Sequence, residues 1–301
     1  MNFIIVLVPV FFIFAVGYVG QKWIGFDTRT LSKMAIYLMS PFLALRTFYQ
    51  NELSLDYVYL TIYALGLCFG LISIVYLLAY VKKYNRKETS SLILSSVFMN
   101  NGNFGTPVAL FVFGTTGFDI AVILLVIQQL IMSTVGVYYA AKGSEVETCL
   151  KDAILAALRI PIAYGAVIGL LLQVLHIEIP DTLYQSINLI ADAAIPTIMI
   201  ILGMQLAKIS LVNLEVGKIL YSINIKLLIA PLVACAFVWV LPVSEVVGDI
   251  MVLMAAMPSA ANTTMFALQF NTKPEFVSSV TLISTIMSII TLPIVLFLLS
   301  L

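Results

Sequence analysis

The chain has 301 residues, of which 62% are hydrophobic and only 10% are charged, and its 15 basic and 15 acidic residues cancel. Soluble domains usually carry about a quarter charged residues, so this composition excludes an ordinary soluble protein. We expect no nucleic-acid partner, because no basic patch is interleaved with aromatic residues. Three scattered cysteines (Cys68, Cys149 and Cys235) and one loop histidine, His176, give no metal spacing, so we expect neither a metal nor an enzyme.

Apolar runs follow one another along the whole chain. A helix needs about 20 apolar residues to cross the hydrocarbon of a bilayer. Runs near that length lie at about 3–21, 31–49, 57–80, 90–113, 118–141, 153–174, 183–207, 221–241, 248–270 and 276–299. The first run lacks the positive start of a signal peptide, and we expect it to be retained. The sequence predicts an all-α, multi-pass protein of the cell membrane with ten transmembrane helices.

Basic residues mark one side of the membrane. They follow the odd-numbered spans, at Lys22, Arg29, Lys33, Lys82, Lys83, Arg86, Lys87, Lys142, Lys151, Arg159, Lys208, Lys218, Lys226 and Lys273. The other loops hold only Arg46. The positive-inside rule then places the odd-numbered loops in the cytoplasm and both termini outside. Lys226 lies about two turns inside its span, and we expect it to extend back to the cytoplasmic interface.

The two halves of the chain have the same pattern. Spans one and six carry an early proline and a later patch of small residues, and spans two and seven each carry a proline near the middle. Spans four and nine hold NNGNFGTPVAL and MPSAANTTMFALQF. Five spans are an odd number, so the second half is inverted relative to the first. We expect a 5+5 inverted repeat over 1–145 and 146–301, which is typical of secondary transporters.

Spans four and nine contain residues that interrupt a helix. We expect the breaks at Asn101 to Thr106 and near Pro258 to Thr263, with Pro107 in the first turn of a new helix. The two broken helices would cross at the middle of the membrane. Backbone groups left unpaired in hydrocarbon cost several kcal/mol each, so they persist only where protein or a cavity satisfies them. Helix N-termini at such a crossing favour an anion.

Asp192 lies about halfway along span seven, where a charge is costly and usually faces a cavity or a partner. We take it as a candidate for coupling to H⁺ or Na⁺, with a hydrogen-bonded packing residue as the alternative. Gln128 and Gln129 in span five, and Ser284, Thr285 and Ser288 in span ten, are more typical of contacts between helices, although Gln128 is kept as a candidate ligand. The glycine pairs 66/70 and 165/169 predict close helix packing.

The whole chain resembles the auxin efflux carrier family, which includes bacterial malate and malonate transporters and the PIN-like auxin carriers of plants. The resemblance depends on VPVFFIFAVGYVG, LMSPFLALRTF, MNNGNFGTPVAL, AAIPTIMIILGMQLA, MPSAANTT and STIMSIITLPIV. It implies a scaffold of spans 1, 2, 6 and 7 that often forms a homodimer. It also implies a transport domain of spans 3–5 and 8–10 that moves like an elevator. The family's crossover positions are matched by Asn101, Asn103, Pro107, Pro258 and Asn262.

We therefore expect a secondary transporter of small organic anions, such as malate, malonate or auxin-like acids, working by alternating access without a cofactor. The candidate substrate-binding residues are Asn100, Asn101, Gly102, Asn103, Pro107, Gln128, Pro258, Ser259, Asn262 and Thr263. Two alternatives stay open. One is a cation/proton antiporter on the same inverted-repeat fold, and the other is a membrane sensor that binds a ligand without transporting it.

Overall fold

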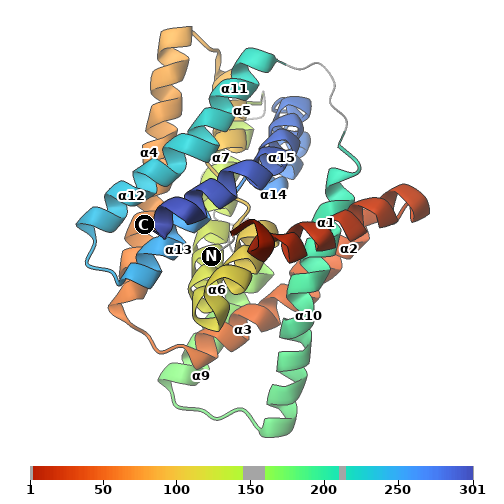
Figure 1. The fold of residues 1–301 in the computed structure, drawn as a ribbon, viewed down its shortest axis with the longest axis vertical. Coiled ribbons are helices and arrows are strands. Elements are labelled where there is room, and N and C mark those ends of the chain that lie inside the picture. The colour runs from red at the N-terminus through yellow and green to blue at the C-terminus, as the bar shows by residue number, and fades with distance from the viewer. Residues whose placement is uncertain (1–2, 145–159, 210–214, 301) are drawn as a thin grey trace. The chain divides into compact units, whose positions relative to one another are not determined.

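The structure is a computed structural model, and it describes residues 3–144, 160–209 and 215–300. In the described part, the regular secondary structure is helical, and one isolated antiparallel bridge joins Met99 and Ser259. In chain order the α-helices are α1 (Phe3–Ile24), α2 (Thr28–Met34), α3 (Ser40–Gln50), α4 (Leu55–Lys82), α5 (Arg86–Ser96), α6 (Thr106–Ile131), α7 (Val137–Lys142), α9 (Pro161–Val174), α10 (Asp181–Leu206), α11 (Val216–Asn224), α12 (Ala230–Val240), α13 (Glu245–Ala255), α14 (Ala261–Gln269) and α15 (Pro274–Leu299) (Figure 1). Short π-helical turns connect with them at Ala35–Met39, Asn101–Gly105, Met132–Gly136 and Ile225–Ile229.

Six helical segments among the described residues are long and apolar enough to cross a membrane. They are Leu7–Ile24, Leu55–Lys82, Asn101–Lys142, Asp181–Leu206, Val216–Val240 and Pro274–Leu299. The expected helical membrane protein is therefore confirmed, while the number ten and the orientation remain predictions. The run near 153–174 is described only from Ile160, and Cys149, Lys151 and Arg159 lie outside the described residues.

The chain divides into two compact units. The first contains the described residues of 1–58, 102–127 and 159–208, and the second those of 59–101, 128–158 and 209–301. The first unit therefore includes α1, α2, α3, α9, α10 and most of α6, whereas the second includes α5, α7, α11–α15 and most of α4. The expected division into a scaffold and a transport domain stays a prediction.

Close backbone contacts hold the first unit together. Helix α1 packs along α10, and α3 packs along α9 and α10 (Figure 1). A Cβ on Gly203 would overlap the carbonyl oxygen of Phe14, and one on Gly165 would overlap that of Pro41. Small residues let transmembrane helices approach in this way. The packing expected of the 165/169 pair is present, whereas Gly70 of the other pair has no neighbour within 4 Å of such a Cβ.

Within α6, Gly114 interrupts the helix with φ 68° and ψ −156°. A positive φ of this kind suits glycine, which has no Cβ to clash. The turn separates 106–113 from 115–131, and it falls where the sequence predicts the connection between spans four and five. The chain therefore changes direction at Gly114, between the helical stretches 106–113 and 115–131.

Three helices of the second unit begin at one cluster of charges. Lys218 Nζ donates to Glu88 Oε1 at 2.5 Å and also to Glu215, and Lys273 Nζ donates to Glu215 Oε1 at 2.7 Å. Glu88 lies in the first turn of α5, Glu215 caps α11 and Lys273 caps α15. We call these four residues the four-charge cluster. It fixes the starts of α5, α11 and α15 at a common level.

One expectation about this unit is wrong. Lys226 does not extend back to an interface: its side chain is 0% exposed and lies in the π-helical turn between α11 and α12. Ser222, one turn earlier, is buried on the same helix. Residues four apart share one face of a helix, so the lysine points the same way as this serine, into the protein.

Candidate functional site

The interruptions expected in spans four and nine are present. Helix α5 starts with a capping box between Asn85 and Glu88 and ends at Ser96, four residues before the end predicted from the sequence. Val97 caps α5, and the next three residues lie outside any helix until the π-helical turn at Asn101–Gly105. Helix α13 ends at Ala255 and α14 starts at Ala261. Proline at position 258 has no amide hydrogen to continue a helix, which explains the second break.

The two interrupted stretches pair with each other through their backbones. The amide of Asn100 donates to the carbonyl oxygen of Pro258 at 2.8 Å, and the amide of Ala260 donates to that of Phe98 at 3.0 Å. These bonds flank the antiparallel bridge between Met99 and Ser259. In this way the two breaks satisfy part of the backbone that each leaves unpaired, as burial in an apolar medium requires.

Side chains complete the pairing. The Ser259 hydroxyl donates to the Ser95 carbonyl oxygen, and the Ser259 amide donates to Ser284 Oγ of α15 at 3.2 Å. Gln128 Nε2 donates to the Met99 carbonyl oxygen at 2.6 Å, while its Oε1 accepts from Asn101 Nδ2. Gln128 therefore connects the Met99 carbonyl oxygen with the Asn101 side chain, a contact of the kind expected of a polar residue between helices, while its role as a ligand stays a prediction.

Two asparagines at the break keep unused polar atoms. Asn100 is 4% exposed and Asn101 is 5% exposed. Among the described residues, neither Asn100 Nδ2 nor Asn101 Oδ1 has a hydrogen-bond partner. Buried polar side chains are nearly always paired, so these atoms mark a place where a further polar group fits.

The other candidate residues occupy different surroundings. Thr263 is buried and its hydroxyl donates to the Ala260 carbonyl oxygen at 2.8 Å, whereas Asn262 is half-buried at the start of α14. Gly102, Asn103 and Pro107 belong to the first unit, where the Gly102 carbonyl oxygen accepts from the Thr106 hydroxyl at 2.8 Å. Their expected roles in binding substrate stay predictions.

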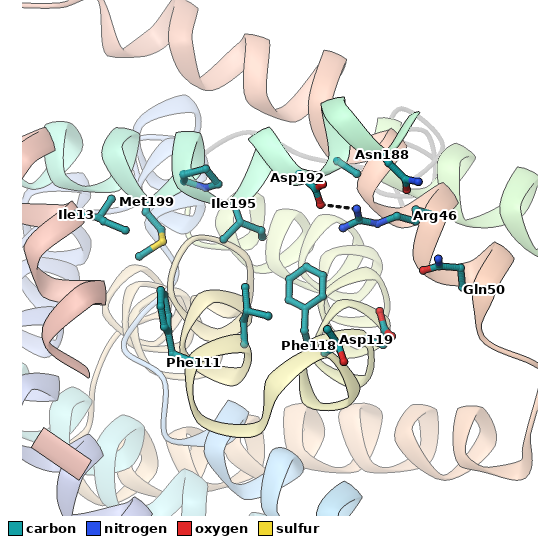
Figure 2. A pocket seen from close by; sticks show the side chains of 14 residues that line it. Ile13, Arg46, Gln50, Phe111, Phe118, Asp119, Asn188, Asp192, Ile195 and Met199 are labelled. Carbon is teal, nitrogen blue, oxygen red and sulfur yellow. Dashed lines mark hydrogen bonds and ion pairs between the residues drawn. The ribbon is translucent and has the colours of Figure 1, made fainter. Parts of the chain in front are cut away.

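The first unit holds a pocket of about 540 Å³ between α1, α3, α6 and α10 (Figure 2). Its polar end is formed by Arg46, Gln50, Asp119, Asn188 and Asp192. Its apolar part is formed by Ile13, Leu110, Phe111, Phe118, Ala191, Ile195, Pro196 and Met199. One charged base and two charged acids give the polar end a formal charge of −1, and the apolar part makes the pocket amphipathic.

An ion pair crosses the polar end of this pocket. Arg46 Nη1 donates to Asp192 Oδ1 at 2.5 Å, and Figure 2 shows the guanidinium of α3 facing the carboxylate of α10. The Asp192 side chain is 69% exposed and that of Arg46 is 15% exposed. The sequence indicates that Asp192 faces a cavity or a partner, and in the structure it has both. Its role in ion coupling is not tested by this arrangement.

Sequence reasoning missed Arg46 and Asp119 as lining residues. In the sequence, Arg46 is notable only as the one basic residue of the loops that follow even-numbered spans. Asp119 lies shortly after Gly114 and belongs to no recognisable motif. The described residues contain no group of three or more His, Cys, Asp or Glu side chains close enough to hold a metal ion.

Long apolar helices, helix packing through glycine and two interrupted helices that pair with each other together define a multi-pass helical membrane protein. The model of the family described as "Membrane transport protein" matches residues 2–296, and the chain belongs to this family. The resemblance to auxin efflux carriers is thereby confirmed.

Three relatives agree with this assignment. An uncharacterized transporter of Methanothermobacter thermautotrophicus is 28% identical over 296 residues, covering 96% of this chain and 94% of its own length. An uncharacterized transporter of Methanocaldococcus jannaschii is 24% identical over 273 residues, covering 87% and 86%. Auxin efflux carrier component 8 of Arabidopsis thaliana is 23% identical over 124 residues, covering 40% of this chain and 34% of its own length.

Proposed function

We propose that the protein is a secondary transporter of small organic anions that binds its substrate where the two interrupted helices pair. The observation that carries the proposal is the pairing of Asn100 with Pro258, with unused polar atoms on Asn100 and Asn101 beside it. Interrupted helices at the middle of the membrane are how secondary transporters build substrate sites. The side-chain amides of Asn100 and Asn262 and the backbone amides at the start of α14 would hold a carboxylate, and Asn101 Oδ1 would accept a hydrogen bond from a hydroxyl or protonated carboxyl of the substrate.

The proposal includes a 5+5 inverted repeat of ten spans with both termini outside. Two packing relations in the first unit support the symmetry. Helix α1 packs on α10 through Gly203, and α3 packs on α9 through Gly165. Helices α1, α3, α9 and α10 are spans one, two, six and seven. If the repeat relates span one to span six and span two to span seven, the contact of α1 with α10 is equivalent to the contact of α9 with α3. We further propose that spans 1, 2, 6 and 7 form a dimeric scaffold and that the remaining spans move as an elevator.

Uptake into proteoliposomes tests the function. Labelled malate, malonate and indole-3-acetate would be offered under a pH gradient, a sodium gradient and neither. We expect saturable uptake of at least one anion, and a loss of about tenfold or more in uptake for Asn101→Ala. Asn224→Ala is the matched control, because Asn224 is exposed and its side-chain amide bonds, within the part of the chain that the structure describes, only to the Leu220 carbonyl oxygen. No saturable flux of any anion would contradict the proposal.

A cation/proton antiporter is the second candidate, and the pocket of Figure 2 favours it, because two carboxylates line the pocket. In that case the same vesicles would exchange sodium for protons without an organic anion. Asp192→Asn would abolish that exchange. Vesicles that take up an organic anion but exchange no sodium for protons would exclude this second candidate.

A further inference from the structure

We propose that Lys226 supplies the positive charge that holds the anion at the paired breaks, together with the side-chain amide of Asn100. This inference rests on the proposed function for the identity of the ligand, and it assigns a group that the crossover motifs do not contain. Lys226 is fully buried, and its Nζ has no hydrogen-bond partner among the described residues. An ammonium taken out of water without a counter-charge is costly, so this position requires an anion or a neutral amine.

The register of three helices places Lys226 at the level of the breaks. Helices α5, α11 and α15 start together at the four-charge cluster, and α11 packs against both of the others (Figure 1). Ten residues from the start of each helix lie Ser96, Lys226 and Ser284. At a rise of 1.5 Å per residue, each lies about 15 Å from the cluster.

A side-chain contact places Lys226 slightly deeper than this count, because Ser222, the seventh residue of α11, lies against Ser95, the tenth of α5, so Lys226 is level with the break that follows Ser96. Ser96 is the last residue of α5 before the break, and Ser284 accepts a hydrogen bond from the Ser259 amide of the other break. Ser222 lies one turn before Lys226 on the same buried face, and its hydroxyl is 2.7 Å from that of Ser95. The lysine therefore lies in a helix face already in contact with the chain that pairs the two breaks.

The local backbone also sets this lysine apart. It occupies the π-helical turn Ile225–Ile229, and such turns occur often at functional sites. If the four-charge cluster lies at the edge of the hydrocarbon, a distance of about 15 Å, half the hydrocarbon thickness, puts the amine near the middle of the membrane. Ionisable residues at that depth usually serve a ligand path or a partner charge.

The unused donors at this level indicate the charged part of the ligand, while the unused acceptor Asn101 Oδ1 suits a hydroxyl or protonated carboxyl elsewhere on the ligand. Lys226 Nζ and Asn100 Nδ2 are both donors, and both lack an acceptor among the described residues. Two buried donors, one of them cationic, match a carboxylate, which accepts several hydrogen bonds and carries the balancing charge. We infer a small mono- or dicarboxylate whose charged group contacts Lys226 and whose remainder extends along the break.

Binding to charge variants tests the inference without transport. Purified wild type, Lys226→Met and Lys226→Arg would be melted with acetate, malonate, malate or indole-3-acetate, and with malonamide as the uncharged match of malonate. We expect one or more anions, but not malonamide, to raise the melting temperature of wild type and Lys226→Arg. Lys226→Met keeps the length of the side chain without its charge, and its affinity should fall at least about tenfold.

The anion-free protein provides the second readout. Lys226→Met should melt at the same temperature as wild type or higher, because the variant removes a buried unpaired amine. A Lys226→Met protein that binds the anion within twofold of wild type, or one that melts well below it without ligand, would overturn the inference. So would wild type that no anion in the set stabilises. Vesicle uptake by wild type that Lys226→Met leaves unchanged would refute the inference while leaving the proposed function intact.

Discussion

The hydroxyl groups of Ser95 and Ser222 lie 2.7 Å apart in the interior of the second unit, 127 residues apart in the chain. Ser95 has a second partner, the Leu92 carbonyl oxygen at 3.2 Å, and its own carbonyl oxygen accepts from Ser259. This contact therefore connects α5, α11 and one of the two breaks. It lies directly between the four-charge cluster and the crossing.

We expect the two serines to be unequal. Ser222→Ala leaves Ser95 with its Leu92 partner, whereas Ser95→Ala removes the partner on which the buried Ser222 hydroxyl depends. The loss in unfolding free energy should be about 0.5 kcal/mol for Ser222→Ala and about 1–2 kcal/mol for Ser95→Ala. Denaturant unfolding of both single variants and the double variant measures this, and equal, additive losses would contradict the coupling.

Gln128 should matter far more than its neighbour Gln129. Gln128→Leu removes the bond to the Met99 carbonyl oxygen and leaves the Asn101 amide without its acceptor, so we expect a loss of about 1–3 kcal/mol in stability and weaker anion binding. Among the described residues, the Gln129 side chain makes only a 3.4 Å contact with Ser133 in the adjoining π-helical turn, so Gln129→Leu is the matched control. Melting temperatures with and without malonate compare the two. Similar effects of the two substitutions would show that the hydrogen bond from Gln128 to the Met99 carbonyl oxygen has no special role.

Two glycines should respond in opposite directions to the same substitution. Gly203→Ala places a methyl group against the Phe14 carbonyl oxygen, and we expect it to destabilise the protein by about 1–3 kcal/mol, because backbone has to move. Gly70→Ala meets no atom within 4 Å in the middle of α4 and should stabilise the protein by about 0.5–1 kcal/mol. Thermal unfolding of the two variants tests this, and a shift of the same sign would refute the packing argument.

Acid should weaken the four-charge cluster. Partial burial raises the pKa of Glu88, but hydrogen bonds from Lys218 and the Asn85 amide and the charges of Lys218 and Lys273 outweigh it, so the pKa lies below its usual 4.5. The pKa of Glu215 is lowered in the same way, with burial opposed by Lys218 and Lys273. A lowered pKa in the folded state stabilises the protein above the unfolded value, and this stability disappears as the pH falls through the folded value.

Glu88→Gln and Glu215→Gln should therefore reduce stability at pH 7 by about 0.5–1 kcal/mol each and flatten the loss of melting temperature below pH 4.5. Glu52→Gln, at an exposed loop position, is the control. Melting curves from pH 7 to pH 3 measure both effects. If the acid-induced decrease stays as steep in the double variant as in wild type, the cluster does not cause it.

Asp192→Asn should separate binding from coupling. The residue lies in the first unit and pairs with Arg46, so its neutral match leaves the paired breaks unchanged. We expect malonate to bind with its wild-type affinity, while the dependence of uptake on pH or sodium is lost. Arg46→Gln, which removes the other half of the ion pair, shows whether any effect comes from the pair or from the carboxylate. Unchanged ion dependence in Asp192→Asn would remove this residue from the mechanism.

The breaks could be read from the sequence because their causes are local. Asparagine, glycine and proline disfavour a helix wherever it lies, so MNNGNFGTPV and MPSAANTT predict interruptions without knowledge of any neighbour. The position at which α5 ends was harder to predict from the sequence. Ser96 is the last helical residue because Phe98 and Asn100 bond to the other break, which lies about 160 residues away in the chain.

Contacts between distant residues could not be read in this way. The pairing of Arg46 with Asp192 joins positions 146 residues apart, and no periodicity predicts it. Lys226 shows the opposite failure. A lysine two turns inside an apolar run has the length to reach an interface, and only the packing of α11 on α5 and α15 shows that its face is closed.

The frame of the crossing consists of peptide groups, which every amino acid carries. One amide-to-carbonyl bond on each side of Met99 and Ser259 joins the two breaks, and these two bonds do not depend on the identity of the side chains around them. Evolution can therefore exchange the side chains that line such a site one at a time. Each exchange alters which solute binds, while the backbone pairing is inherited unchanged. Distant relatives can therefore differ in substrate while they keep the same paired backbone.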